Sequence, residues 1–388
     1  MKERPVIYLD YASGTPLHGD VDAAMQPFFR ERFANPRALH RDGVANKEVI
    51  EEARASIGKL LNASQDELYF TSGGTDANMR ALWGVVNALQ DSGRELSNMH
   101  VVVSMLEHSS VRACAEMFAR RGLSVSFAPV TTEGVVDVTK LQELIQDNTV
   151  LVSVMLVNNE IGTVQPIEEI AKIIREKRKT SHGQTPLLHT DATQAPLTIR
   201  LDMKKLGADL VTLDAYKMYG PAGSGLLFVR TGVPYVGLCG VLHGRSGYEG
   251  ATPNTGAIVG LEKALTLAQK RYEETALHFN ALSTYLIKRI HERFSECIVN
   301  GEKTECAGGI VNVTFPGSEG EFLVAQLSEH GIAASAKSAC LSGGGEGSYV
   351  IAAFDREHAN NTIRFSFGYS TTREDIDVLM SVLSDIIS

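Results

Sequence analysis

The sequence predicts an α/β fold in which a largely parallel sheet carries helices on both faces. Short apolar segments alternate with longer segments of helical periodicity, and five of the apolar segments end near Thr71, Glu107, Val157, Thr190 and Leu213. A cluster of polar residues follows each of them. This alternation is typical of parallel sheets, which bind ligands at the carboxyl ends of their strands. We therefore expect the polar clusters to meet along one edge of the sheet.

Composition and charge narrow the class of protein. The 388 residues are enough for two or three domains, and the apolar share of 44% is typical of soluble globular proteins. The net charge of −9 argues against a general nucleic-acid binder. No apolar run approaches the length of a membrane span, and no apolar signal segment follows Met1, so we expect a cytoplasmic protein.

The cysteines favour free thiols in a reducing compartment. Their number is odd and no CxxC pair occurs among Cys114, Cys239, Cys297, Cys306 and Cys340. This pattern argues against a disulfide framework and against a zinc ribbon, and we expect no metal site.

The N-terminal part predicts a turn-rich entry and two helices. An apolar segment over 6–10 leads into a stretch of turn residues that ends at Pro16. Apolar residues at helical spacing predict helices over 20–32 and 44–61, the second ending near Asn62.

The segment after the second helix predicts a strand, a glycine-rich turn and a helix, over 68–71, 72–76 and 77–89. This order points backbone N–H groups at an anion, with Gly74 allowing close approach and the Thr75 hydroxyl adding a donor. An ordinary helix cap explains the same residues, and the sequence leaves both interpretations open.

The next two strands also end in residues that suit either a site or a local cap. After the strand over 100–105, His108 could stack on a flat cofactor ring, move protons or cap the following helix. The continuously apolar strand over 150–157 fits a strand buried on both faces, and it stops at Asn158 and Asn159. These two residues could line a site or form a turn.

An aspartate and a lysine follow the last strands of the predicted sheet. Asp191 comes after the strand over 186–190 and could pair with a pyridinium nitrogen or cap a helix. Lys217 lies between two apolar strands, over 210–213 and 226–229. A lysine at a strand end in partly dry surroundings loses its proton more readily, and the free amine can form a Schiff base with pyridoxal phosphate.

Taken alone, Lys217 is better explained as a surface loop lysine, because most lysines in proteins are exposed. The same sheet edge, however, would bring together Thr75, His108, Asn159, Asp191, Gln194 and Lys217. This set offers a phosphate cradle, a ring stacker, groups for the ring oxygen, a pyridinium partner and a Schiff-base amine. The combination favours a pyridoxal phosphate site.

The C-terminal part predicts a second domain entered through a long helix over 256–294. A strand over 362–367 carries Arg364, which alternation places on the face opposite Ile363 and Phe365. An inward guanidinium can clamp a substrate carboxylate at two points. Cys340 lies in a loop with four glycines after it, which favours an accessible nucleophilic thiolate over a buried inert thiol. We expect the other cysteines to be inert.

Motifs over nearly the whole chain resemble those of the cysteine desulfurases, which are fold-type I, class V pyridoxal phosphate enzymes. This group supplies sulfur for iron–sulfur clusters and tRNA thiolation. The motifs, in order, are Tyr8-Leu-Asp-Tyr-Ala-Ser-Gly-Thr-Pro16, Phe70-Thr-Ser-Gly-Gly-Thr75, Glu107-His108, Val157-Asn-Asn-Glu-Ile-Gly162, Asp191-Ala-Thr-Gln194, Lys217-Met-Tyr-Gly-Pro221, Ser338-Ala-Cys340 and Ile363-Arg-Phe-Ser366.

The resemblance implies a large cofactor-binding domain over 15–258 with a mostly parallel seven-stranded sheet. A smaller α+β domain would comprise 1–14 and 259–388 and carry the Cys340 loop and Arg364. The enzyme would be a homodimer in which Thr252 reaches the cofactor phosphate of the neighbouring subunit.

The resemblance also implies a role for each site residue. Lys217 would hold the cofactor as a Schiff base, Asp191 would pair with its ring nitrogen, and His108 would stack on its ring. Further cofactor contacts would come from Gly74, Thr75 and Tyr216 at the phosphate and from Asn159 and Gln194 at the ring oxygen. L-cysteine would bind through Arg364 and Asn159, and Cys340 would take its sulfur as a persulfide, release alanine and pass the sulfur to an acceptor protein.

Some positions depart from the family pattern. Asp214 and Tyr216 stand where the family usually has Ser and His in contact with phosphate. An ionised Asp214 would repel the phosphate, so either Asp214 points away or cofactor affinity is lowered. Glu249 stands where the family usually has an arginine, and Arg245 is the alternative residue for that contact. The chain also has little tail after its closing helix, whereas relatives that deliver sulfur to iron–sulfur scaffolds often have a longer one for docking.

Two other functions remain open at this point. One is another class V activity, such as that of a selenocysteine lyase or an aminotransferase-like enzyme. The other is a catalytically quiet paralogue that serves as a binding partner, which the residues at 214, 216 and 249 motivate.

Overall fold

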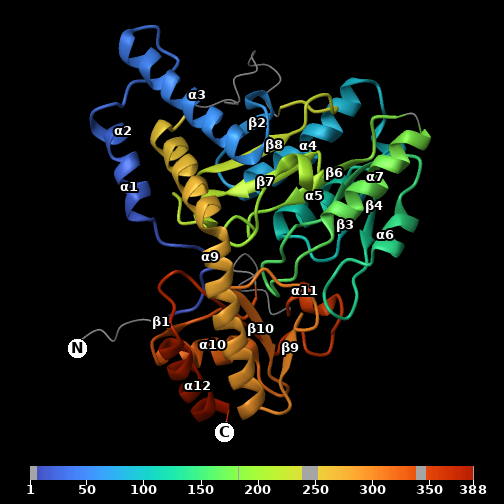
Figure 1. The fold of residues 1–388 in the computed structure, drawn as a ribbon. Coiled ribbons are helices and arrows are strands. Elements are labelled where there is room, and N and C mark those ends of the chain that lie inside the picture. The colour runs from blue at the N-terminus through green and yellow to red at the C-terminus, as the bar shows by residue number, and fades with distance from the viewer. Residues whose placement is uncertain (1–6, 182, 238–251, 338–346, 388) are drawn as a thin grey trace.

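The computed structural model describes residues 7–181, 183–237, 252–337 and 347–387. A seven-stranded sheet forms its centre (Figure 1). The strands lie side by side in the order β2 Leu68–Thr71, β8 Gly225–Val229, β7 Leu210–Asp214, β6 Leu187–Asp191, β5 Thr149–Ser153, β3 His100–Ser104 and β4 Ser124–Ala128. Only β8 is antiparallel to its neighbours. The predicted mostly parallel sheet is confirmed.

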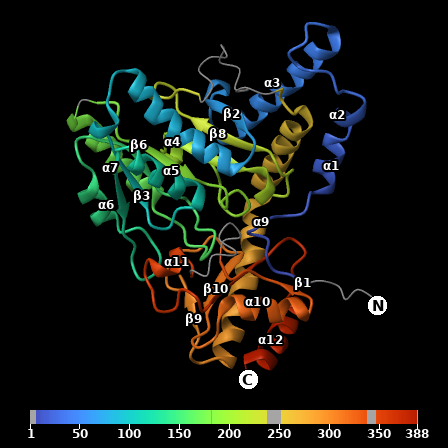
Figure 2. The ribbon, with the colours of Figure 1, turned by 180° about the vertical axis from the view of Figure 1, so that it is seen from behind.

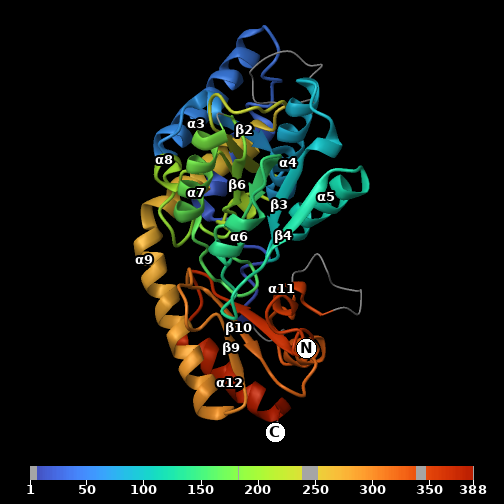
Figure 3. The ribbon, with the colours of Figure 1, turned by 90° about the vertical axis from the view of Figure 1, so that its right-hand side faces the viewer.

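Helices cover both faces of this sheet, as Figure 3 shows from the side. On one face α4 Gly74–Asp91 and α5 Ser109–Arg120 pack against Val101 and Val103 of β3. The other face carries α3 Arg41–Leu61, α6 Val138–Leu144, α7 Ile167–Ser181, α8 Met203–Leu206 and the first half of α9 Thr255–Arg293. Strand residues alternate between these two cores, which is why the strands are apolar on both sides.

The helices before the sheet differ in one respect from the prediction. The segment 20–32 forms two helices, α1 Gly19–Met25 and α2 Pro27–Arg30, in place of one. Pro27 has no backbone N–H to donate into α1, so it begins the second helix. The helix expected over 44–61 is present as α3, and Asn62 ends it in the left-handed conformation at φ 57°.

Two elements of the sheet region also differ from expectation. β5 stops at Ser153, although the apolar run continues to Val157. Beyond Ser153 the chain still follows β6, through the Val154 amide to the His189 carbonyl at 3.1 Å and the Leu156 amide to the Asp191 carbonyl at 2.8 Å. The edge strand β4 was not predicted, because its residues are mostly exposed or half-buried.

A second hydrophobic core lies around the C-terminal half of α9, which runs the length of the molecule (Figures 1 and 2). It contains an antiparallel sheet in the order β12 Thr362–Ser366, β10 Ile310–Thr314 and β9 Ile298–Asn300. Also present there are α10 Gly320–Glu329, α11 Tyr349–Ala352 and α12 Arg373–Ile387. The N-terminal strand β1 Ile7–Tyr8 pairs with β11 Ile332–Ala333, so both ends of the chain join this part.

Among the helices that the structure describes, none combines the length and the apolar character needed to cross a lipid bilayer.

Candidate active site

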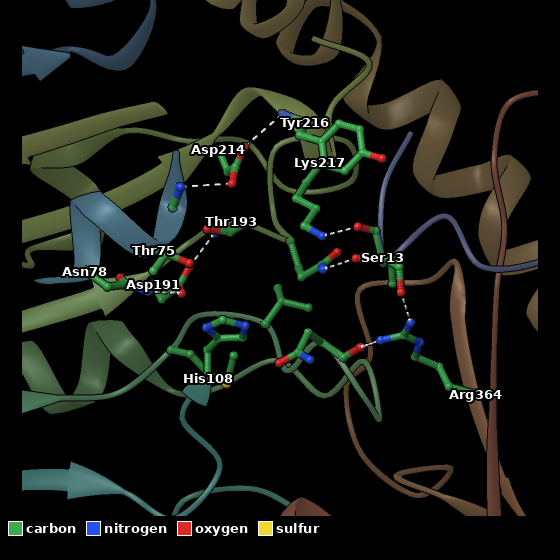
Figure 4. A pocket seen from close by; sticks show the side chains of 16 residues that line it. Ser13, Thr75, Asn78, His108, Asp191, Thr193, Asp214, Tyr216, Lys217 and Arg364 are labelled. Carbon is green, nitrogen blue, oxygen red and sulfur yellow. Dashed lines mark hydrogen bonds between the residues drawn. The ribbon is translucent and has the colours of Figure 1, made fainter. Parts of the chain in front are cut away.

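A cavity of about 190 Å³ opens at the carboxyl ends of the parallel strands (Figure 4). All six residues expected to meet at this edge line it. The complete lining is Ala12, Ser13, Gly74, Thr75, Asn78, His108, Met155, Val157, Asn159, Asp191, Thr193, Gln194, Asp214, Tyr216, Lys217 and Arg364. The cavity therefore combines residues of the central sheet with the N-terminal segment and β12.

Lys217 projects into the cavity from the short 3₁₀ turn Ala215–Lys217 that follows β7. Its Nζ donates a hydrogen bond to the Ser13 carbonyl at 2.5 Å and lies 5.6 Å from the centre of the Tyr216 ring. The side chain is half-buried. A lysine held in this way by the protein differs from a solvated surface lysine, and its amine faces the space where a ligand would bind.

Asp191 is a buried carboxylate at the end of β6, with an exposed fraction of 5%. Asn78 donates to Oδ2 at 2.7 Å and the Thr193 amide donates to Oδ1 at 2.9 Å. Asp191 forms no salt bridge with any described residue. A buried carboxylate that lines a cavity and has no cationic partner among the described residues suits a ligand that brings a positive charge, such as a protonated ring nitrogen.

Two buried groups beside Asp191 are neutral near pH 7. Burial lowers the pKa of His189 to about 4, against the opposing effect of Asp191, and its ring lies within hydrogen-bonding distance of Ser153 and Thr212. Burial foremost, and then the charge of Asp191, raises the pKa of Glu107 from 4.5 to about 8. Glu107 therefore keeps its proton near pH 7 while it lies beside the Asp191 carboxylate.

Glu107→Gln tests this assignment through stability. Between pH 4.5 and about 8 the unfolded chain has released the Glu107 proton while the folded protein keeps it, so folding stability falls as pH rises. Gln keeps the acceptor for the Met155 amide, which bonds Oε1 at 2.5 Å. As pH rises from 5 to 8, we expect the difference in folding free energy between the variant and the native protein to shift in favour of the variant by on the order of 2 kcal/mol.

Thermal unfolding at several pH values across this range measures that difference. The exposed Glu329→Gln is the control. A stability difference between Glu107→Gln and the native protein that stays constant from pH 5 to pH 8 would contradict the assignment.

A cradle for an anion lies at the start of α4. Gly74 is its first residue, three positions earlier than expected. A Cβ at Gly74 would lie only 3.2 Å from Asp214 Oδ2 and from Thr193 Oγ1, so glycine leaves this space open. Thr193 Oγ1 is buried and has no hydrogen-bond partner among the described residues. Backbone N–H groups at a helix start and an unpaired hydroxyl suit the oxygens of a phosphate.

Asp214 points into this cradle. Its Oδ2 accepts a hydrogen bond from the Gly74 amide at 2.9 Å, and its Oδ1 accepts one from the Tyr216 amide at 2.9 Å. Of the two alternatives for Asp214, the one in which it points away is wrong. Tyr216 itself is 40% exposed, and its ring covers Gly14.

His108 is the predicted helix cap and also lies on the wall of the cavity. It is the N-cap of α5, because its Nδ1 accepts from the Ser110 amide at 3.2 Å. Its ring also lines the cavity.

The two asparagines after the strand β5, Asn158 and Asn159, have different roles. Asn158 forms the turn, with its Oδ1 accepting from the amides of Glu160 and Ile161, while Asn159 lines the cavity.

Arg364 enters the cavity from β12 and is only 2% exposed. Nη2 donates to Asp10 Oδ1 at 2.5 Å and to Ser13 Oγ at 2.6 Å, and Nη1 donates to the Asn159 carbonyl at 2.9 Å. Nε has no partner among the described residues. Ile363 and Phe365 lie in the second core, as strand alternation predicts. The guanidinium is thus fixed in position by three of its five N–H donors, and the Nε–H and the second Nη1–H remain for a ligand.

Several lining residues were not singled out from the sequence. Asn78 lies one helical turn after Gly74, so helical spacing alone places it on the same face. Thr193 lies inside the Asp191–Gln194 motif. Ser13 carried no comparable pattern, because its partners Lys217 and Arg364 are far away in the sequence.

Of three further expected site residues, Gln194, Thr252 and Cys340, the structure shows only Gln194 at the cavity. Gln194 lines the cavity, and its Nε2 donates to the Ala12 carbonyl at 2.9 Å. Thr252 is exposed and does not line the cavity of its own chain. Cys340 lies outside the described residues, as do Arg245, Glu249 and Cys239.

The described cysteines match the expectation of inert thiols. Burial raises the pKa of Cys114, Cys297 and Cys306 to about 11 in each case, which keeps the thiols protonated.

The comparisons with known proteins agree with this geometry. The family model described as aminotransferase class-V matches residues 7–379. The cysteine desulfurase IscS of Dictyoglomus turgidum is 36% identical over 98% of this chain and 94% of its own length. Cysteine desulfurase IscS 1 of Archaeoglobus fulgidus is 38% identical over 98% and 96%.

Solved structures show the same similarity. A NifS-like protein superposes with a TM-score of 0.87 at 28% identity, over 98% of this chain and 99% of its own. SspA in complex with cysteine superposes with a TM-score of 0.77 at 29% identity, over 93% and 98%.

Proposed function

Because this chain belongs to the cysteine desulfurases of the class V aminotransferase family, we propose that its cavity binds pyridoxal phosphate and L-cysteine through the residues described above. The enzyme is a pyridoxal-phosphate-dependent desulfurase that converts L-cysteine to alanine. The observation that carries the residue assignment is that Lys217, Asp191 and Arg364 line one cavity. An amine, a buried anion and a buried guanidinium are the groups that this chemistry requires.

The donor set of the cavity fits the cofactor. When bound, pyridoxal phosphate supplies an aldehyde that joins to amines and a ring that withdraws electrons from the attached carbon. Lys217 would provide the amine, and Asp191 would hold the proton on the ring nitrogen. Gly74, Thr75 and Thr193 would bind the phosphate. Contacts with the ring would come from His108, Asn159 and Gln194, and Tyr216 would be the further contact expected at the phosphate.

The substrate would be oriented by the opposite wall of the cavity. Arg364 would bind the carboxylate of L-cysteine, with Asn159 beside it, and Asp10 and Ser13 would hold the guanidinium in place. Lys217 Nζ would take the proton from the substrate Cα and return one to carbon later. Its half-buried position keeps the amine close to the reacting carbon.

Sulfur transfer would use the Cys340 thiolate. It attacks the substrate Sγ, the Cβ–Sγ bond breaks, and the bonding electron pair stays on Cβ, which takes up a proton. The products are alanine and a persulfide on Cys340, so atoms and electrons balance without an outside oxidant. A thiol of an acceptor protein, in iron–sulfur cluster assembly or tRNA thiolation, would then take the outer sulfur.

Arg364→Lys is expected to raise KM for L-cysteine roughly 10- to 100-fold while leaving cofactor affinity unchanged. Lysine keeps the charge but loses the planar two-point contact, which is worth about as much as a charge-assisted hydrogen bond. Steady-state kinetics with a cofactor titration of the same protein measures both quantities. An unchanged KM would remove Arg364 from substrate binding.

Two further parts of the proposal concern assembly. A homodimer is supported by Thr252, which is exposed in its own chain and free to face a partner's cavity. The two hydrophobic cores of the described residues support a division into two domains close to the proposed 15–258 and 1–14 with 259–388, but Leu261, Ala264 and Ala268 of α9 still belong to the core of the central sheet. This division would put Lys217 in one domain and Arg364 with Cys340 in the other.

A substrate panel tests the function. The purified protein with added cofactor and a thiol reductant is given L-cysteine, L-selenocysteine or an amino donor with a keto acid. Alanine and sulfide in equal amounts from L-cysteine would support the proposal. Activity confined to selenocysteine or to amino transfer would favour another class V reaction. Cofactor binding without any turnover, or no binding, would favour the quiet paralogue.

A further inference from the structure

We propose that the Asp214 carboxylate occupies the place of the cofactor phosphate at the start of α4, so that pyridoxal phosphate must displace it to bind. This inference rests on the proposed function, because it presumes that the cavity takes this cofactor. Asp214 lines the cavity and is held there by two backbone amides, those of Gly74 and Tyr216. Figure 4 shows the carboxylate beside Thr193 and Thr75.

The competition follows from the single hydrogen of the Gly74 amide. Asp214 Oδ2 accepts that hydrogen at 2.9 Å. A phosphate oxygen in the cradle would need the same donor, because the glycine leaves room for close approach there. The two anions cannot both accept it well. They would also repel each other, since the cavity is partly enclosed and screens charge less than bulk water does.

The carboxylate also stabilises the protein when no cofactor is bound. A helix start favours a negative charge and needs acceptors for its free amides. Asp214 meets both needs for α4 from a neighbouring strand, β7. Removing it is therefore expected to have two effects of opposite sign, weaker folding of the cofactor-free protein and stronger cofactor binding.

Asp214→Ser is the variant that separates these effects. We expect its dissociation constant for pyridoxal phosphate to fall by at least about tenfold, as removal of a nearby like charge predicts. The melting temperature of its cofactor-free form is expected to be lower than that of the native protein. Absorbance or fluorescence titration and thermal unfolding give both values without any measurement of turnover.

Two comparisons place the effect at the phosphate. Affinity for pyridoxal, which lacks the phosphate, is expected to be the same in the native protein and the variant. Asp76 supplies the matched control because it lies in the same first turn of α4, pairs with Arg80 at 2.8 Å and does not line the cavity. Asp76→Asn is expected to change cofactor affinity far less than Asp214→Ser.

Asp214→Asn distinguishes charge from hydrogen bonding. Asparagine keeps an acceptor for the Gly74 amide but loses the charge, so its cofactor affinity is expected to lie between those of the native protein and Asp214→Ser.

The outcomes are distinct. Unchanged or weaker binding of pyridoxal phosphate by Asp214→Ser would overturn the inference while leaving the proposed function intact. Equal gains for pyridoxal and pyridoxal phosphate would also overturn it, because the effect would then lie elsewhere in the cavity. If neither the native protein nor the variant binds the cofactor, the proposed function fails and the inference fails with it.

Discussion

Lys217→Ala is expected to lower turnover of L-cysteine by at least about 10³-fold and to abolish covalent attachment of the cofactor. The reason is the position of Nζ, which lies 2.5 Å from the Ser13 carbonyl in the cavity that Asp191 also lines. Alanine has neither the amine that joins to an aldehyde nor a group that can move the Cα proton. Reduction with borohydride followed by mass spectrometry detects the attachment, and alanine release reports turnover.

Lys205 offers a matched control for this experiment. It lies on α8 with a side chain that is 77% exposed, and its ion pair with Glu168 spans 3.9 Å. Lys205→Ala is expected to keep both the attachment and the activity. A Lys217→Ala protein that still carried the reduced cofactor would show that another lysine is the attachment site.

Cys340→Ser is expected to keep the cofactor and lose both the persulfide and alanine production. Serine preserves the size of the side chain, but its hydroxyl is a far weaker nucleophile towards sulfur than a thiolate. Cofactor absorbance, alanine release and mass spectrometry of the peptide around 340 give the three quantities. Cys306→Ser is the control, because burial raises the pKa of that thiol to about 11. Full activity of Cys340→Ser would remove Cys340 from the mechanism.

The parts of the site that could be predicted are those set by strand ends. Asp191 and Lys217 each follow an apolar strand, and neighbouring parallel strands bring such residues to one edge. Arg364 could be placed by alternation, because its neighbours Ile363 and Phe365 must face the core. The ends of strands and the alternation along them were therefore enough to predict the central residues of the site.

The parts that could not be predicted depend on contacts between distant segments. Ser13 meets both Lys217 and Arg364, and nothing local in the sequence encodes those pairs. The direction of Asp214 also needed geometry, since the sequence allowed it to point either way. The limits of β5 were missed because the apolar run continues beyond the strand, where the chain stays buried and bonded to β6 through the amides of Val154 and Leu156.

The most direct test of the account is a single turnover without reductant. The cofactor-loaded enzyme is mixed with one equivalent of L-cysteine, and alanine is quantified together with the sulfur bound to each cysteine-containing peptide. The account predicts one alanine and one extra sulfur atom on Cys340 for each active site. Alanine without sulfur on Cys340, or sulfur on another cysteine, would contradict it.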